Sequence, residues 1–479
     1  MHTLGCKLNQ LESEALAGAF AAAGFKVLSR PEGRHEEAAD ITAVNTCTVT
    51  GKAEQKARRL IRKLLRDCPS SCVLVTGCYA ELDRKELERL AVESGALSAT
   101  GERRLFIIPG SRKKALQALA AFLASACPER RWELPSLIQS WMDTHGDVQD
   151  EGGPDWPNPQ SSFFRSRAFI KIQDGCDKRC AFCRVRLARG KSVSLKAEEA
   201  LARLRDLEAR GLGEAVLTGV NIGLYRAPAG KTELNMAGLL KFLLEGTDGI
   251  ALRLSSLEPD EITEDLFEII RSTRIRSHFH ISVQSGSAEV LKRMGRNYGP
   301  ETVEAAAARL RELRGDPFLA CDIITGFPGE GERDFEETFE LCRRIGFAWI
   351  HAFPYSPRPG TAAASMKPAV SEREAGKRVA ALMELARQGR AAYIQRWLGR
   401  SVEAVCESGE DSCFFHAVSE NYLRLLCGSA FGEERPLPGR AFMCRINTTE
   451  NSGEADAVGE ILGQGPGTSC FPLRRPGPI

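Results

Sequence analysis

Short apolar runs alternate with amphipathic stretches through the middle of this sequence, and that alternation most constrains the fold. Between residues 163 and 392, six runs have the composition of strands: AFIKIQ, AVLTGVN, ALRLSSL, FHISVQS, LACDIITGF and WIHAFPYS. Most of them precede a helical stretch. Repeated strand-then-helix units are typical of a parallel sheet that curves into an open or partial barrel. We therefore predict a partial (β/α)6 barrel over residues 163–392.

Two other regions flank this barrel in the chain of 479 residues. Residues 1–126 show the same alternation and predict a separate parallel α/β sheet domain. Residues 127–162 predict a helix and then a linker, because residues 143–162 are rich in Gly, Pro, Asp and Ser and lack an apolar period. Short strands separated by turn residues predict a small antiparallel β-barrel over residues 396–466. The predicted fold class is therefore α/β and multidomain.

Composition excludes several classes of protein. With 43% hydrophobic and 27% charged residues the chain is neither collagen-like nor wholly disordered. It has no apolar stretch long enough for a membrane helix and no export signal, so we expect no membrane contact and a cytoplasmic location. Its 65 basic and 63 acidic residues neither require nor exclude a nucleic-acid partner. Sixteen cysteines in such a chain favour metal or redox chemistry over disulfides.

Three cysteines are closely spaced in the segment GCDKRCAFC: Cys176, Cys180 and Cys183. The segment directly follows a predicted strand, which places the thiols on a loop at the strand's C-terminal end. A zinc site is the alternative, but structural zinc usually takes paired two-residue spacings and a fourth ligand, and the sequence has no second pair of that spacing. Three thiolates instead leave one iron of a four-iron cluster open. The motif resembles that of the radical S-adenosylmethionine superfamily, in which this iron binds the cofactor.

A second set of cysteines is dispersed in sequence. Cys6, Cys47 and Cys78 each end an apolar run that precedes a helical pattern. Singly, each is more simply a buried apolar residue. Because the ends of parallel strands share one edge of a sheet, the three thiols together predict a second cluster with three protein ligands.

A family resemblance joins these motifs. Nine segments resemble the tRNA methylthiotransferases, and most closely the branch that acts on N6-threonylcarbamoyladenosine. They are HTLGCKLNQ, VNTCTVT, VTGCYAE, IQDGCDKRCAFC, LTGVNIG, RLSSLEPDEI, SVQSGS, ITGFPGE and PYSPRPGT. That family has an N-terminal methylthiotransferase cluster domain, a radical barrel and a C-terminal TRAM domain, in this order. The resemblance implies 2-methylthiolation of threonylcarbamoyladenosine at position 37 of tRNA, with two S-adenosylmethionine molecules and two 4Fe-4S clusters.

The resemblance also implies that the two clusters have different chemical roles. The cluster on Cys6, Cys47 and Cys78 carries a sulfur that one S-adenosylmethionine methylates. The cluster on Cys176, Cys180 and Cys183 cleaves a second molecule and yields the radical that activates C2 of adenine. Since an unreactive C–H bond requires cofactor chemistry, we expect no catalytic side chains beyond the cluster ligands.

Candidate cofactor-binding residues lie at strand ends. Gly219, Asn221 and Gly223 occupy a segment where the family lets backbone approach the methionine part of the cofactor, although a tight turn explains these glycines equally well. Ser255 and Gln284 lie beyond two further strands, on the face where such barrels bind ligands, and are also candidates.

The expected partners are a tRNA substrate and an electron donor such as flavodoxin or ferredoxin, and we expect a monomer. The segment KARRLIRKLLR and the aromatic residues Phe414, Phe415 and Tyr422 are candidates for RNA contact. The alternatives are a solvated helix face and a barrel core.

The chain departs from the family in three respects. After Cys183 the family continues with an apolar pair, a proline and an aromatic residue before Arg-Gly, whereas this chain reads RVRLARG with Arg186 at the proline position. A stiff turn is thereby lost, and a nearby cation is expected to raise the cluster's potential. The first strand is short, which suggests a mis-assigned start. Ten cysteines match no cluster position and receive no function: Cys68, Cys72, Cys127, Cys321, Cys342, Cys406, Cys413, Cys427, Cys444 and Cys470.

Alternative functions remain open at this point. Methylthiolation of a ribosomal-protein aspartate uses the same six cysteines, and isopentenyladenosine in tRNA is another acceptor. A non-catalytic RNA-binding iron–sulfur protein is a third class, which the intact Cys176, Cys180 and Cys183 set disfavours.

Overall fold

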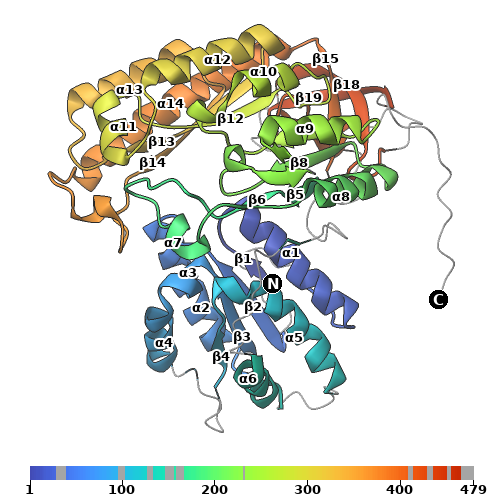
Figure 1. The fold of residues 1–479 in the computed structure, drawn as a ribbon, viewed down its shortest axis with the longest axis vertical. Coiled ribbons are helices and arrows are strands. Elements are labelled where there is room, and N and C mark those ends of the chain that lie inside the picture. Colours follow the sequence, from blue (N-terminus) through green and yellow to red (C-terminus); the bar gives the residue numbers. More distant parts are fainter. Residues whose placement is uncertain are drawn as a thin grey trace.

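The computed structural model describes residues 1–28, 39–94, 96, 103–126, 133–145, 156–157, 167–229, 232–407, 414–428, 435–449 and 455–464. Figure 1 shows an N-terminal domain in blue, a larger central domain in green to orange, and a small barrel in red beside the central domain. Cys127, Cys413, Cys470 and most of the predicted linker lie outside the described residues. No helix among the described residues is long and apolar enough to cross a membrane.

The N-terminal domain has a four-stranded parallel sheet whose spatial order follows the chain: β1 (His2–Thr3), β2 (Ile41–Thr46), β3 (Cys72–Gly77) and β4 (Leu105–Ile107). Its helices are α1 (Lys7–Ala22), α2 (Gly51–Asp67), α3 (Cys78–Leu82), α4 (Arg84–Glu93), α5 (Lys113–Ser125) and α6 (Leu134–His145). Alternate residues of β3 face opposite cores: Val73 and Val75 pack with α2 and α4, whereas Leu74 packs with α1, α5 and α6. Helices therefore cover both faces, as expected for a parallel sheet.

The central domain confirms the predicted partial barrel. Its strands are β5 (Ala168–Lys171), β8 (Glu214–Thr218), β11 (Ala251–Leu254), β12 (His278–Gln284), β13 (Phe318–Thr325) and β14 (Trp349–Pro354). They form two parallel three-stranded sheets, β5-β8-β11 and β12-β13-β14, which single-residue bridges join at Leu252–Ile275 and Leu257–Ile281. Each strand matches one of the six apolar runs, because buried parallel strands need continuous apolar sequence.

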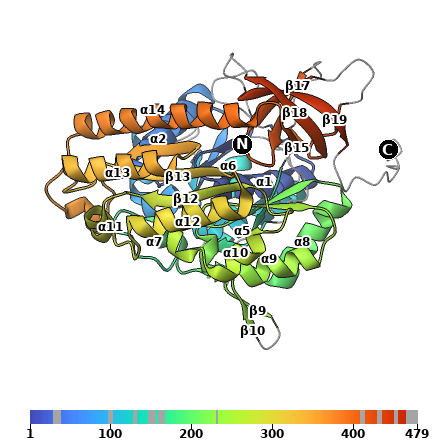
Figure 2. The ribbon, with the colours of Figure 1, turned by 90° about the horizontal axis from the view of Figure 1, so that it is seen from above.

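The helices of the central domain cover the outside of these sheets: α8 (Ala197–Ala209), α9 (Met236–Glu245), α10 (Glu264–Ile270), α11 (Ala288–Met294), α12 (Pro300–Arg314), α13 (Glu332–Ile345) and α14 (Glu372–Trp397). Two small features were not predicted. One is the hairpin of β9 (Ala227–Ala229) and β10 (Thr232–Leu234), which projects from the domain in Figure 2. The other pairs β6 (Gln173–Asp174) with β7 (Val193–Ser194).

The C-terminal barrel is closed and follows the order β15-β16-β17-β19-β18. Its strands are β15 (Ser401–Cys406), β16 (Phe414–Ser419), β17 (Arg424–Gly428), β18 (Ala441–Thr449) and β19 (Ala457–Gln464). Four neighbouring pairs are antiparallel, which confirms the predicted small antiparallel barrel, whereas the fifth pair, β17 and β19, is parallel. The reason is geometric, since five strands cannot alternate direction around a closed ring. The barrel adjoins the C-terminal end of α14 (Figure 2).

Candidate functional site: two cysteine triads at a domain interface

The first triad, Cys176, Cys180 and Cys183, follows β6 on a loop at the end of β5. All three side chains are partly exposed. Burial, and then the neighbouring thiols, raise the pKa of Cys183 to about 11, and burial is also the main cause that raises the pKa of Cys176 to about 11. The three thiols therefore lie within one another's electrostatic range. Iron binding would displace their protons.

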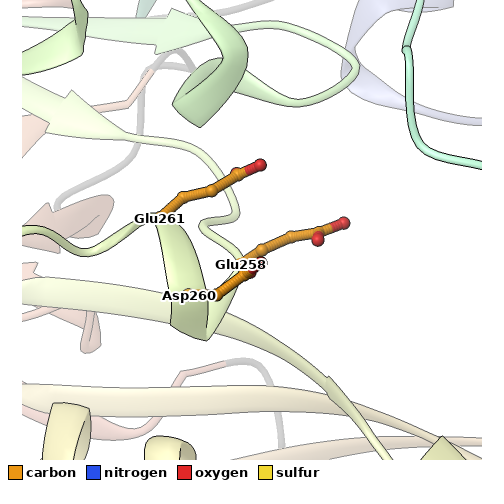
Figure 3. A group of neighbouring side chains, drawn as sticks. All are labelled: Glu258, Asp260 and Glu261. Carbon is orange, nitrogen blue, oxygen red and sulfur yellow. The ribbon is translucent and has the colours of Figure 1, made fainter. Parts of the chain in front are cut away.

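The loop is fastened to the segment after β11 by Lys178. Its Nζ lies 3.3 Å from Glu258 Oε2, 3.0 Å from Asp260 Oδ2 and 3.2 Å from Glu261 Oε1. Figure 3 shows the three acidic side chains on one short stretch of chain. One carboxylate oxygen from each lies within 4.8 Å of the other two. That spacing would suit a cation, but the Lys178 ammonium already supplies positive charge there. We interpret the acidic group as an anchor for the cysteine loop, an anchor that the sequence analysis missed.

The second triad, Cys6, Cys47 and Cys78, meets at one edge of the N-terminal sheet. Cys6 precedes α1, Cys47 follows β2 and Cys78 begins α3. Burial, and then the proximity of Cys6 and Cys78, raise the pKa of Cys47 to about 11. Gly5 has φ +107° and lies against Cys47, so that a Cβ added there would come within 2.4 Å of the Cys47 Cβ. The strand ends thus gather three thiols that are far apart in sequence.

Both donor sets fit an iron–sulfur cluster. Each offers three thiols, and thiolates are the usual ligands of such clusters. Three protein ligands leave one iron open for a further ligand. Seven of the ten remaining cysteines are buried and belong to neither triad: Cys68, Cys72, Cys321, Cys342, Cys406, Cys427 and Cys444.

The segment with Gly219, Asn221 and Gly223 lies against the acidic group that anchors the first triad's loop. Asn221 Nδ2 donates to Glu261 Oε1 at 3.0 Å, and its backbone N–H donates to Gln173 Oε1 at 2.9 Å. A Cβ at Gly219 would come within 2.8 Å of Gln173 Oε1, and one at Gly223 within 2.2 Å of Glu261 Oε2. Close packing therefore explains both glycines, and their role in cofactor binding stays a prediction.

Ser255 and Gln284 are buried at the ends of neighbouring strands, Ser255 just after β11 and Gln284 at the end of β12. Gln284 has φ +68° and lies at a shift in the register of β12 against β13. A non-glycine residue in this conformation is strained, and such residues cluster at functional sites. Cofactor binding by these two residues also stays a prediction.

An arginine of the central domain reaches the second triad. Arg189 Nη1 lies 2.8 Å from Glu12 Oε1 and 3.0 Å from Asp174 Oδ1, while Nη2 donates to Asn9 Oδ1 at 3.0 Å. Burial alone would raise the pKa of Glu12, but Arg189 and two lysines hold it well below its usual value. Arg189 also interacts electrostatically with Cys78. The Arg-Gly pair after GCDKRCAFC was noted in the sequence, but its partners were not foreseen.

A second arginine, Arg358 in the segment PYSPRPGT, approaches from the opposite part of the central domain. Its Nη2 donates to Thr48 Oγ1 at 3.0 Å and forms an ion pair with Glu54. Arg358 also interacts electrostatically with Cys47. The second triad therefore lies beside two cations of the central domain, with Cys47 and Cys78 buried and Cys6 exposed.

The candidate RNA-binding helix, KARRLIRKLLR, lies within α2. One face of α2 is buried through Ala57, Ile61 and Leu64. The basic side chains Lys52, Lys56 and Arg59 recur at helical spacing on its exposed face. We call these three residues the basic stripe.

The three aromatic candidates in the barrel differ in environment. Phe414 is 55% exposed, whereas Phe415 is buried in the barrel core. Tyr422 stacks on His278 of the central domain with ring centroids 3.9 Å apart. Of the three, Phe414 alone presents a largely exposed ring, and the other two are structural.

Comparison with known proteins agrees with this architecture. Residues 170–342 match the radical SAM superfamily, and residues 1–97 match a family described as uncharacterized protein family UPF0004. Together with the fold and the two triads, these matches define a radical S-adenosylmethionine enzyme with an additional N-terminal cysteine domain.

Curated relatives define the family more closely. The chain is 42% identical to the threonylcarbamoyladenosine tRNA methylthiotransferase MtaB of Treponema pallidum over 89% of this chain and 93% of that protein. It is 32% identical to the protein of the same name from Thermotoga maritima, over 85% and 86% of the two chains. A tRNA-2-methylthio-N(6)-dimethylallyladenosine synthase of Jannaschia is 31% identical over 85% and 82%. The chain belongs to the threonylcarbamoyladenosine tRNA methylthiotransferase MtaB family.

Proposed function

We propose that this protein transfers a methylthio group to C2 of N6-threonylcarbamoyladenosine at position 37 of tRNA, using two S-adenosylmethionine molecules and two 4Fe-4S clusters. The observation that carries the proposal is the arrangement of the triads at one domain interface. Arg189 follows the first triad by six residues and lies in the field of Cys78 in the second. The relatives named for threonylcarbamoyladenosine, which include the one with 42% identity, support the same acceptor.

In this proposal Cys176, Cys180 and Cys183 hold the cluster that binds S-adenosylmethionine, and Cys6, Cys47 and Cys78 hold the other. The two clusters supply radical generation and a sulfur source when bound, which no side chain can supply. Lys178 and its carboxylate partners hold the first loop in place. Arg189 and Arg358 bring positive charge to the second triad, where three thiolates would otherwise repel one another.

Deletion of the gene tests the acceptor directly. Nucleosides from total tRNA are analysed by mass spectrometry, and we expect 2-methylthio-N6-threonylcarbamoyladenosine to disappear while its precursor accumulates. A plasmid copy of the parent should restore the product, and a Cys176→Ala, Cys180→Ala, Cys183→Ala copy should not. An unchanged nucleoside profile would refute the proposal. Loss of the methylthio group from isopentenyladenosine instead would assign the chain to the sister activity.

Iron content tests the ligand assignment. Anaerobically reconstituted parent protein should bind about eight irons, two cubanes. Alanine at all three residues of either triad should leave about four. Cys444→Ala, a matched change of a buried barrel cysteine, should leave the full number. A first-triad variant that kept both clusters would disprove the assignment.

For partners, we infer that tRNA phosphates contact the basic stripe and that the exposed Phe414 ring lies on an RNA-facing surface. Lys and Arg supply most phosphate contacts, and exposed aromatic rings stack on unpaired bases. A flavodoxin or ferredoxin as electron donor, a monomeric state and a cytoplasmic location complete the proposal. Reconstitution of turnover with each purified donor, in place of a chemical reductant, tests the electron donor.

A further inference from the structure

The residue after Cys183 forms an ion pair across the domain interface. Arg184 belongs to the segment RVRLARG, and its side chain is only 6% exposed. Its Nη1 lies 2.8 Å from Asp83 Oδ2 and its Nη2 lies 3.2 Å from Asp83 Oδ1. Asp83 follows Cys78 of the second triad by five residues. One guanidinium therefore connects the segments that carry the two triads.

The same guanidinium has two further partners. Its Nη1 lies 3.1 Å from Glu54 Oε1 and 3.2 Å from Thr48 Oγ1, and Thr48 directly follows Cys47. Arg358 donates to the same two side chains. Two cations of the central domain thus meet two carboxylates of the N-terminal domain in a mostly buried, charge-balanced group. Removing one member of such a group leaves its partner's charge uncompensated.

Arg184 and Arg189 flank a single helical turn, α7 (Val185–Arg189), which lies beside α3 at the interface in Figure 1. Arg184 precedes the turn and binds Asp83, while Arg189 ends it and binds Glu12. The two carboxylates lie on different parts of the N-terminal domain, α1 and the start of α4. The turn is therefore attached to the N-terminal domain at two separate points.

We propose that Arg184 is a positioning residue. Together with Arg189 it attaches α7 to the N-terminal domain at two points, an arrangement that we call the α7 bracket, and this attachment sets the separation and orientation of the two triads. The inference rests on the proposed function, because a methylthio transfer requires the acceptor carbon to lie between both clusters. A bidentate guanidinium–carboxylate pair fixes direction as well as contact, which apolar packing does not. Arg186, two residues later in the same turn, is partly exposed and forms no ion pair among the described residues.

The test compares Arg184→Ile with Arg186→Ile, a matched change in the same turn. Hydrogen exchange of the iron-loaded protein without tRNA is measured first. We expect exchange in residues 185–189 and 78–83 to rise at least tenfold in Arg184→Ile and to stay within twofold of the parent in Arg186→Ile. Arg184→Lys, which keeps the charge but loses the bidentate geometry, should lie between them. Asp83→Asn removes the same ion pair from the other side and should show the same rise in exchange as Arg184→Ile. It provides the same test if Arg184→Ile does not fold.

The second readout is the coupling between cleavage of S-adenosylmethionine and formation of the methylthio nucleoside. With tRNA present, 5′-deoxyadenosine formed per methylthio nucleoside should rise at least threefold in Arg184→Ile, at unchanged iron content, because the radical forms without a correctly placed acceptor. Equal exchange, or an equal product ratio, in the Arg184 and Arg186 variants would overturn the inference. A parent that makes no methylthio nucleoside would refute the proposed function, while the exchange comparison would still decide whether the α7 bracket exists.

Discussion

Arg253 and Glu214 form a two-pronged ion pair in the interior of the protein, with Nε to Oε1 at 2.6 Å and Nη2 to Oε2 at 2.8 Å. Both side chains are 1% exposed. Arg253 also donates to the Ser419 carbonyl at 3.0 Å, and Arg276 links the same carboxylate to Glu403 of β15. The pair therefore joins the central domain to the C-terminal barrel.

Glu214→Gln should destabilise this junction. The amide keeps the shape of the side chain but leaves two buried guanidinium groups without their shared anion. Breaking a buried pair in this way costs about 3–5 kcal/mol. Urea unfolding followed by fluorescence should show a lower midpoint for the variant. Glu340→Gln, which removes an exposed partner of Arg343 on α13, should leave the midpoint unchanged. Equal midpoints for the two variants would contradict the role of the pair.

The same carboxylate predicts a pH dependence. Burial alone would raise the pKa of Glu214, but Arg253, and then Arg276, lower it to about 2 from a usual value of 4.5. A group whose pKa is lowered by folding stabilises the protein above its unfolded pKa and loses that effect as the pH falls. The stability difference between the parent and Glu214→Gln should therefore be constant from pH 7 to 5. It should then shrink by about 3 kcal/mol between roughly pH 4.5 and 2. A difference that stays constant to pH 3 would exclude this linkage.

Gly5→Ala should disrupt the second cluster selectively. The added methyl group would lie 2.4 Å from the Cys47 Cβ, so the cysteine must move away from its triad. Iron content should fall from about eight to about four per chain. Gly24→Ala is the matched control, because Gly24 also has positive φ, at +89°, but has nothing within 4 Å of the added atom. The prediction fails if both variants retain the same iron.

Alanine at Lys52, Lys56 and Arg59 should weaken tRNA binding. Each lost phosphate contact should lower the slope of log affinity against log salt by about 0.7–0.9, so three contacts should lower it by about 2–3. Filter binding at several salt concentrations measures this slope. A triple variant with the same loss of charge on exposed helices of the central domain, Lys241→Ala, Arg333→Ala and Lys377→Ala, should keep the parent slope. Equal slopes in the two triple variants would show that α2 is a solvated face.

Local sequence predicted the strands of the central domain because their signal is short-range. A buried parallel strand needs a continuous apolar run, and all six runs became strands. The same holds for Cys176, Cys180 and Cys183, whose spacing within one loop already brings the thiols together. Placing Cys6, Cys47 and Cys78 at strand ends required one further step, the rule that parallel strands end at a common edge.

The roles of the two unusual arginines could not be read from the sequence. The missing proline drew attention to Arg186, but the structure leaves Arg186 partly exposed and buries Arg184 instead. No local pattern indicates that Arg184 pairs with Asp83, 101 residues earlier. Gly219 and Gly223 show the opposite case. The sequence suggested that they let backbone approach a bound cofactor, but close packing against neighbouring side chains also explains them.

The sequence by itself determined the main strands of this protein and predicted a role for six of its cysteines, because strand periodicity, turn residues and loop spacing act over a few residues. Only the tertiary structure decided how the domains meet. Packing between domains brings Arg184 to Asp83 and Arg189 to Glu12. It also brings Arg253 to the Ser419 carbonyl of the barrel. Such ion pairs depend on burial and on the relative orientation of distant segments, which a linear pattern does not encode.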